Sequence, residues 1–304
     1  MPQSPAITDP EIAAFVAEAD GFPPEPPGDI AAQRRAYDAM AAHFRVPRPA
    51  GVSVTDASLP GPAGPIPVRS YAPGAPGRVR IVYCHGGAYS LGGLESHDDV
   101  CAEIAAATGC VLTAVDYRLA PEHRHPAAFE DALAATEAAL AEGPAVVAGD
   151  SAGGGLAAAV ALALRGRAEL RGQALIYPTL GGEALGLASY ADCATAPLLT
   201  TADILALQAA RAGGPPPLDD PSFAPLLAVD MDGAAPCYAT AAEVDPLRDD
   251  APALAERLRV AGVPVTLRIE AGLPHMWLRA RHRSAAAKAA FAALCAGIAA
   301  LARD

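Results

Sequence analysis

The sequence predicts an α/β protein with a mostly parallel, doubly wound sheet. Short apolar runs such as VRIVYC (79–84) and AVVAGD (145–150) are typical of strands that are buried on both faces. Helix-compatible segments alternate with these runs, and such alternation indicates parallel strands joined by right-handed crossovers. The 304 residues, 52% of them hydrophobic, suffice for one large domain, which we expect to span the whole chain.

Helical patterns come first along the chain, and strands follow. Residues 10–44 contain two helical pieces separated by the turn-forming PPEPPGD, in which Asp29 is a candidate cap for the second helix. Residues 52–81 show the alternation and the turn residues of strands. The later strands are expected at 79–84, 111–117, 145–150, 173–178, 236–243 and 263–270, and the later helices at 127–142, from Ser151, at 249–261 and from Arg281.

Residues 181–227 interrupt the alternation of strands and helices. The segment is too long to be a plain connection between two elements. We expect it to form a helical cap over the strand ends, together with residues 1–45.

The charge of the chain disfavours several classes of partner. Acidic residues outnumber basic ones 34 to 22, and the resulting net charge of −12 would repel nucleic acid and anionic membrane surfaces. The alanine-rich stretch 289–302 is shorter than the ~18 apolar residues that a membrane span needs, and the N-terminus shows no secretory pattern. We expect a cytoplasmic protein that acts on a small molecule, with a homodimer as one possible assembly.

The six cysteines give no sign of a metal site. They are scattered, without a C-x-x-C pair or histidines at the spacing of zinc ligands. We expect reduced, buried thiols, and the chemistry described next requires neither a metal nor an organic cofactor.

The motif GDSAG (149–153) is the sharpest local signal for chemistry. It lies between an apolar strand pattern and a helix pattern, as a nucleophile elbow does, and the glycines leave room for the strained backbone of Ser151. The N–H of Ala152, at the start of the helix, would point at a developing oxyanion. The same five residues also fit an ordinary strand-to-helix turn, so further observations are needed.

The motif HGGAY (85–89) supplies one of them. It follows the strand at 79–84 and therefore lies at the same carboxyl edge of the sheet as Ser151. Glycines allow the backbone to approach a substrate, and we expect Gly86 and Gly87 to provide the other oxyanion donors.

A serine nucleophile needs a histidine base, which a carboxylate orients. Of the seven histidines, only His275 lies in a loop directly after a late strand. Asp245 follows the strand at 236–243, and Glu243 and Asp249 are its competitors, although Asp249 is better placed to cap the next helix. The order Ser151, Asp245, His275 is the order found in α/β-hydrolases.

With these residues in place, the chain resembles the bacterial members of the hormone-sensitive lipase family of α/β-hydrolases. The resemblance runs from about Pro65 to Leu278 and adds YRLAPEH (117–123) and DPLRD (245–249) to the two motifs above. It implies the α/β-hydrolase fold with a helical cap, and hydrolysis of carboxylic esters with short or medium acyl chains. It also implies that Ser151 is the nucleophile, His275 the base and Asp245 the acid, with Gly86, Gly87 and Ala152 as the oxyanion hole.

Two departures from the family pattern concern the pocket. Ala88 replaces the third glycine of the usual HGGG, and its methyl group would narrow the acyl side or restrict the loop. Met276 and Trp277 follow the base where the family usually has glycine and phenylalanine. Positions beside the motifs make Tyr89, Asp150, Tyr177 and Trp277 candidate pocket residues, while Arg118 and Glu122 are expected to brace the loops.

The sequence leaves three alternatives open. The same fold can serve as a non-catalytic binding protein, although such relatives usually lack a triad residue. The same triad also serves hydrolases of amides, lactones or acetylated sugars, and acyltransferases.

Overall fold

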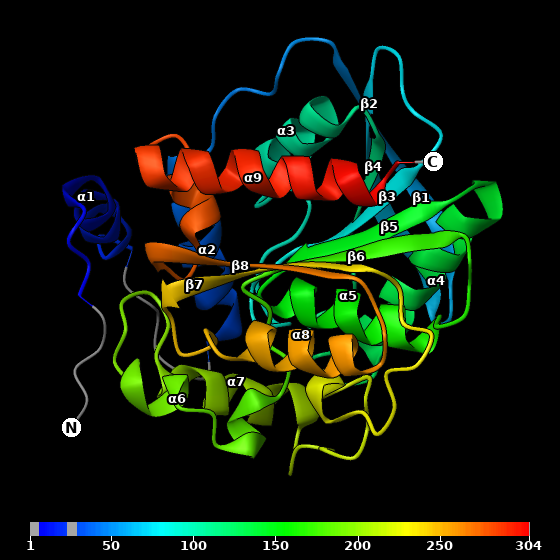
Figure 1. Cartoon of the computed structure of the whole chain (residues 1–304). Coiled ribbons are helices and arrows are strands. Elements are labelled where there is room, and N and C mark those ends of the chain that lie inside the picture. The colour runs from blue at the N-terminus through cyan, green and yellow to red at the C-terminus, as the bar shows by residue number, and fades with distance from the viewer. Residues whose placement is uncertain (1–5, 23–28, 304) are drawn as a thin grey trace.

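An eight-stranded sheet forms the centre of the protein (Figure 1). The computed structural model describes residues 6–22 and 29–303. The strands lie in the order β1-β2-β4-β3-β5-β6-β7-β8; β2 is antiparallel to both of its neighbours, and all other neighbouring pairs are parallel. Their bounds are β1 (Val52–Gly61), β2 (Gly64–Pro73), β3 (Arg80–Cys84), β4 (Val111–Val115), β5 (Ala145–Asp150), β6 (Leu170–Ile176), β7 (Cys237–Val244) and β8 (Val265–Pro274).

Helices cover both faces of the sheet, as the alternating pattern predicted (Figure 1). On one face lie α3 (Asp98–Thr108) and α9 (Ala285–Leu301), which pack against each other. On the other face lie α4 (Ala127–Glu142), α5 (Ala152–Ala163) and α8 (Asp250–Val260). The last helix starts four residues later than predicted, because the 3-10 turn Trp277–Ala280 and a further turn follow β8.

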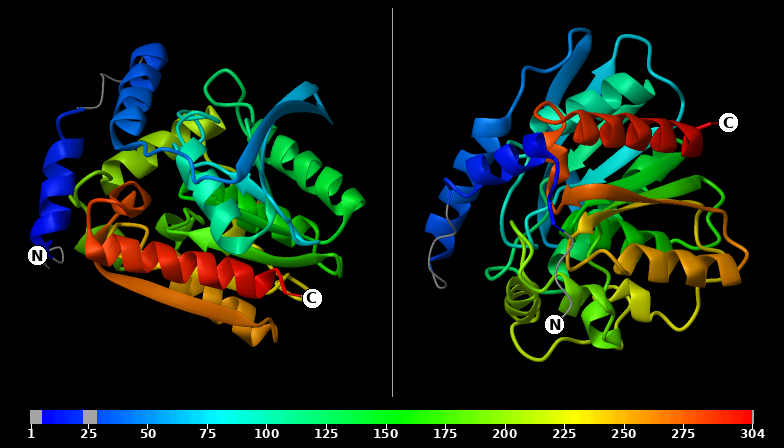
Figure 2. Two further views of the ribbon diagram at one scale, coloured as in Figure 1. Left: turned by 90° about the horizontal axis from the view of Figure 1, so that it is seen from above. Right: turned by 60° about the vertical axis from the view of Figure 1, so that its left-hand side comes forward.

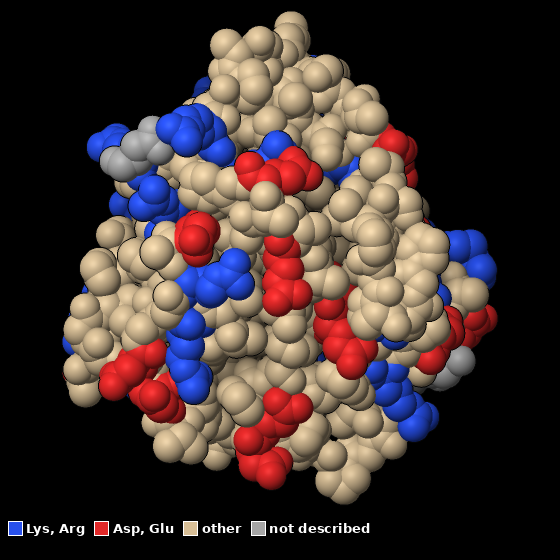
Figure 3. All heavy atoms as spheres, turned by 90° about the vertical axis from the view of Figure 1, so that its right-hand side faces the viewer, with Lys and Arg blue, Asp and Glu red and all other residues tan. Residues whose placement is uncertain are grey.

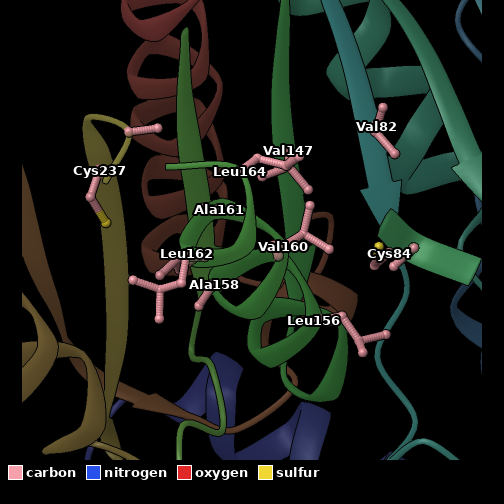
Figure 4. Close-up of a cluster of buried hydrophobic side chains, with 14 of the residues drawn as sticks. Val82, Cys84, Val147, Leu156, Ala158, Val160, Ala161, Leu162, Leu164 and Cys237 are labelled. Atoms are coloured by element: carbon pink, nitrogen blue, oxygen red, sulfur yellow. The ribbon is translucent and has the colours of Figure 1, made fainter. Parts of the chain in front are cut away.

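The helix α5 lies in the middle of the core. Every residue from Ala152 to Leu162 is buried, and most are glycine or alanine, so the helix axis comes close to the sheet. Figure 4 shows Leu156, Val160 and Leu162 of this helix among side chains of β3, β5 and β7. Each such side chain contributes about 1.5–3 kcal/mol to the stability of the fold when it is buried completely. The strand-to-helix turn at Ser151 is therefore anchored in the best-packed part of the molecule.

The remaining helices come from the two segments predicted to form a cap. The first segment gives α1 (Pro10–Ala19) and α2 (Ile30–Phe44), which contact each other through Phe15 and Phe44 and lie on one side of the molecule (Figure 2). Asp29 accepts a hydrogen bond from the N–H of Ala32 at the start of α2, as predicted. The second segment gives α6 (Ser189–Asp192), α7 (Thr201–Ala212) and two 3-10 turns, Gly182–Leu185 and Pro225–Leu227. Residues 1–5 and 23–28 of the predicted cap, including most of the PPEPPGD turn, lie outside the described residues.

Arginine side chains brace the loops around the carboxyl edge of the sheet. The guanidinium of Arg118 donates to both carboxylate oxygens of Asp131 on α4, and the guanidinium of Arg34 on α2 donates to both carboxylate oxygens of Glu122. Arg34 also donates to the carbonyl oxygens of Ser90 and Ala120, which ties α2 to the loop after β3. The bracing role predicted for Arg118 and Glu122 is thus confirmed.

The distribution of charged side chains and the state of the cysteines can be compared with what the sequence predicted. Figure 3 shows basic and acidic side chains intermixed on the face at the right of Figure 1. All six cysteines are free and buried, and burial raises the pKa of Cys84, Cys237 and Cys295 to about 12. Within residues 6–22 and 29–303, no helix is both long and apolar enough to cross a membrane.

Candidate active site

Ser151 occupies a strained turn between β5 and α5. Its φ of 54° and ψ of −117° lie outside the helical and extended regions, and its N–H donates to the carbonyl oxygen of Ile176 on β6. The turn packs directly on the end of β3, since a Cβ added to Gly149 would lie 2.5 Å from the carbonyl oxygen of Cys84. Only glycine fits at this position. The tight packing holds the serine side chain at the carboxyl edge of the sheet, as the elbow motif predicted.

The structure brings Ser151, His275 and Asp245 together in one hydrogen-bonded chain. Ser151 Oγ lies 3.0 Å from His275 Nε2, and His275 Nδ1 lies 2.7 Å from Asp245 Oδ2. His275 and Asp245 are buried and follow neighbouring strands, β8 and β7. Because a carboxylate only accepts, Nδ1–H donates to Asp245, and the other ring nitrogen is left to accept from the serine hydroxyl.

The competing carboxylates have other partners. Asp245 also accepts from the N–H of Leu247, which fixes the second oxygen. Glu243 accepts from the N–H of Gly272, and Asp249 accepts from the N–H of Ser189. Asp249 occupies the N-cap position of α8, but its side chain makes no capping hydrogen bond there, so the predicted capping role is wrong.

Gly86 is not available as an oxyanion donor, and this prediction is corrected. Its N–H donates to Asp150 Oδ1 over 2.9 Å. The next two N–H groups, those of Gly87 and Ala88, have no acceptor within the part of the chain that the structure describes, nor has that of Ala152. Ala88 adopts the left-handed region with a φ of 55°. The free donors are therefore one residue further along the loop than the sequence suggested.

Asp150 lies beneath this loop and not in a pocket. Its carboxylate accepts from the hydroxyl of Tyr83 over 2.8 Å and contacts His97 Nε2 at 3.3 Å, in addition to Gly86. Burial opposes its ionisation, but the attraction of His97 and the hydrogen bonds from His97 and Tyr83 outweigh burial and hold the pKa of Asp150 below its usual value. An ionised Asp150 thus fixes the loop that carries the free donors.

His85, the first residue of the loop motif, is neutral. Its ring stacks on Tyr117 with centroids 4.3 Å apart, and Nδ1–H donates to the carbonyl oxygen of Gly86. Burial, followed by the repulsion of His97, lowers the pKa of His85 to about 4. The side chain therefore supports the loop as an uncharged group.

A cavity of about 30 Å³ opens beside Ser151. Its apolar wall comes from Leu199, Ile204 and Leu207, in and before α7, and from Leu247 after β7. Ala88 and Tyr89 line it from the loop after β3, and Thr179 and Gln208 complete the lining.

Comparison with known proteins gives concordant results. A family model described as the alpha/beta hydrolase fold matches residues 81–279. The chain is 39% identical to the carboxylic ester hydrolase LipN of Mycobacterium tuberculosis over 75% of its own length and 65% of LipN, and so spans slightly less than two thirds of that relative. It is 35% identical to the ethyl acetate hydrolase of Pseudomonas putida over 70% of its own length and 72% of that enzyme. A crystal structure of an esterase from the bacterial hormone-sensitive lipase family is 28% identical and superposes with a TM-score of 0.88, covering 97% of this chain and 99% of the other.

The chain belongs to the hormone-sensitive lipase family of carboxylic ester hydrolases.

Of the four residues predicted to form the substrate pocket of this family member, one lines the cavity and three do not. Tyr89 lines the cavity. Asp150, Tyr177 and Trp277 are not among its lining residues and are buried. Tyr177 packs edge-on against the His275 ring, and Trp277 packs against Tyr177. The two aromatic side chains therefore hold the histidine ring in place and do not line the cavity. Their prediction as pocket residues is wrong because β6 and β8 turn these side chains into the core.

The sequence reasoning missed the wall that α7 contributes to the cavity. Ile204, Leu207 and Gln208 recur at helical spacing, and this spacing is the signal that a buried helix face was present. Nothing in the spacing indicates that the face would lie over Ser151. No group of three or more potential metal-binding side chains occurs among the described residues.

Proposed function

We propose that this chain hydrolyses carboxylic esters with short to medium acyl chains through an acyl-enzyme on Ser151. The observation that supports this most strongly is the hydrogen-bonded chain from Ser151 through His275 to Asp245. It combines an activated nucleophile, a base and an orienting acid.

In the first step, His275 Nε2 takes the proton of Ser151 while Oγ attacks the ester carbonyl carbon. The negative charge that develops on the carbonyl oxygen is accepted by backbone N–H groups, for which we propose Gly87, Ala88 and Ala152. Asp245 stabilises the imidazolium that forms. His275 then protonates the oxygen of the departing alcohol, which leaves Ser151 acylated.

In the second step, water replaces the alcohol. His275 takes a proton from the water, and the resulting hydroxide attacks the acyl-enzyme. The same N–H groups hold the second oxyanion, and collapse of the intermediate returns the proton to Ser151 and releases the carboxylic acid.

The dimensions of the cavity support a limit on the acyl chain. A volume of about 30 Å³ leaves little room beyond a few heavy atoms. Ala88 lines the same space, and we infer that its methyl group takes up volume that a third glycine would leave free. The similar Pseudomonas putida enzyme is described as an ethyl acetate hydrolase, in agreement with a small acyl group.

We also propose that α1, α2, α6 and α7 act together as the cap of this single-domain enzyme. The support is that α7 supplies lining residues to the cavity beside Ser151, and that Arg34 of α2 holds the loop after β3. Both predicted cap segments therefore contact the region in which substrate would bind.

A series of p-nitrophenyl esters from acetyl to palmitoyl tests the proposal. We expect kcat/KM to be highest for acetyl to butyryl esters, and to fall as the chain outgrows the cavity. Ser151→Ala should reduce turnover of the butyrate to background. Full activity of that variant, or the fastest turnover at palmitoyl, would contradict the proposal.

A further inference from the structure

Two residues that line the cavity each carry a buried polar atom without a hydrogen-bond partner in the described part of the chain. The hydroxyl of Tyr89 and Oε1 of Gln208 are unpartnered within the described residues, and both residues line the cavity beside Ser151. Tyr89 is 3% exposed and Gln208 is 5% exposed, so solvent does not satisfy them. Buried polar groups without partners are uncommon and unfavourable, and at a binding cavity they indicate a ligand that completes them.

Gln208 stands at a position where an apolar residue would pack. It lies on the buried face of α7 with Ile204 and Arg211, and its Nε2 makes a long hydrogen bond of 3.5 Å to Thr179 Oγ1. The amide can also bind Thr179 through its oxygen, and the free atom is then a donor and not an acceptor. A hydroxyl group matches both arrangements, because it donates and accepts.

Tyr89 is held rigidly beside the cavity. The guanidinium of Arg211 lies 3.7 Å from the centre of its ring and 4.2 Å from that of Phe223. Arg211 also donates to the carbonyl oxygens of Ser222 and Phe223, so its guanidinium binds groups of the protein and not a substrate carboxylate. The φ of Tyr89 is 60°, a strained value for a bulky residue, and strain of this kind is concentrated at functional sites.

A glycine on α5 makes room for the tyrosine hydroxyl. A Cβ added to Gly155 would lie 2.5 Å from the hydroxyl oxygen of Tyr89 and 2.5 Å from the carbonyl oxygen of Thr179. Thr179 also contacts Gln208 through its hydroxyl, so Thr179 lies near both Tyr89 and Gln208.

The acyl part of an ester fits this cavity better than the alcohol part does. The departing alcohol must receive its proton from His275, and His275 is not among the residues that line the cavity. The other substituent of the carbonyl carbon, the acyl chain, then extends from Ser151 towards Leu207 and Gln208.

We propose that the cavity selects short acyl groups that carry a hydroxyl, which forms hydrogen bonds with the free atom of the Gln208 amide and with the hydroxyl of Tyr89. This inference rests on the proposed function and specifies its substrate class. An unsubstituted acyl chain leaves both atoms unpaired, so it binds less well in the transition state.

The test compares ethyl 3-hydroxybutyrate with ethyl butyrate, with acid release followed in a pH-stat. The measured quantity is the ratio of kcat/KM for the two esters, in the wild type and in Gln208→Met and Tyr89→Phe. Dividing the wild-type ratio by the variant ratio removes the intrinsic difference in ester reactivity. We expect a quotient of about ten for each variant, since each lacks one hydrogen bond to the substrate hydroxyl. Leu205→Met, on the exposed face of α7, is the matched control and should give a quotient of one.

The outcomes separate this inference from the proposed function. Absence of p-nitrophenyl acetate hydrolysis by the wild type would contradict the proposed function itself. Normal hydrolysis of that ester, with a quotient of one for both variants, would overturn only the hydroxyl selection. A preference that appears instead for 3-hydroxybutyl acetate over butyl acetate would overturn the assignment to the acyl side. Tyr89→Phe removes a single oxygen, so it remains informative if Gln208→Met does not fold.

Discussion

Replacing Gly153 with alanine should damage both the stability and the activity of the enzyme. An added Cβ would lie 2.5 Å from the carbonyl carbon of Cys84 and 2.6 Å from the carbonyl oxygen of His85. Ordinary contacts of a Cβ begin at 3.4 Å, so the methyl group overlaps the carbonyl carbon of Cys84 by almost 1 Å, and it overlaps the carbonyl oxygen of Cys84, its nearest neighbour, by more. Main-chain atoms cannot move aside as a flexible side chain does, and therefore α5 or the end of β3 must shift.

The magnitude of the effect follows from this overlap. Overpacking of a core lowers the free energy of unfolding by about 1–3 kcal/mol. Because the added methyl group meets two backbone carbonyls, we expect a loss of about 3 kcal/mol for Gly153→Ala. For a chain of 304 residues, the entropy of unfolding is about 0.6 kcal/mol/K, so the corresponding fall in melting temperature is about 5 °C. A displacement of Ser151 by about 1 Å relative to His275 would lower kcat about 10²-fold.

The assay combines urea unfolding with turnover of p-nitrophenyl butyrate. Gly214→Ala is the matched control, because a Cβ there meets nothing within 4 Å and the φ of Gly214 is not positive. It should stay within about 1 kcal/mol of the wild type and keep full activity. Gly153→Ala with the stability and kcat of the control would refute the account of how the elbow is packed.

Two further predictions concern the buried groups under the donor loop. Asp150→Asn replaces an ionised acceptor of three hydrogen bonds by a neutral amide. We expect the free energy of unfolding in urea to fall by about 2–3 kcal/mol, and kcat to fall about 10–100-fold because Gly86 is displaced. Unchanged values would mean that the loop does not depend on this carboxylate. For His85, the folded-state pKa of about 4 lies below the ordinary value of about 6.5, so the unfolded chain binds the proton first as the pH falls. The contribution of neutral His85 to the free energy of unfolding is complete above pH ~6.5 and is lost towards pH ~4, a difference of about 3 kcal/mol. Urea unfolding of the wild type should show this loss, and His85→Asn should lack it. Parallel pH profiles of the two proteins would contradict this prediction.

The sequence predicted the sheet and its helices well because strands that are buried on both faces leave an unambiguous pattern. Apolar runs such as 79–84 and 145–150 can be satisfied only between two helical layers. It also predicted the positions of Ser151, Asp245 and His275, because in a parallel sheet the residues that follow the strands meet at one edge. The homodimer and the cytoplasmic location stay predictions.

The sequence could not predict which N–H groups of the loop are free. Gly86 and Asp150 are 64 residues apart and meet because β3 pairs with β5. That pairing places the Asp150 carboxylate under Gly86, and the residues of the HGGAY motif do not indicate this contact. Gln208 was missed for a similar reason, since the position of α7 over Ser151 depends on how the second segment packs on the sheet.

The central claim is that Ser151 forms a covalent acyl-enzyme with the help of His275. The most direct measurement is titration with a p-nitrophenyl alkylphosphonate, followed by mass spectrometry of the peptides. We expect one equivalent of p-nitrophenol per chain, loss of esterase activity in proportion, and a phosphonyl group on Ser151, with no adduct on Ser151→Ala. An adduct on another residue, or esterase activity that persists after complete labelling of Ser151, would contradict the claim.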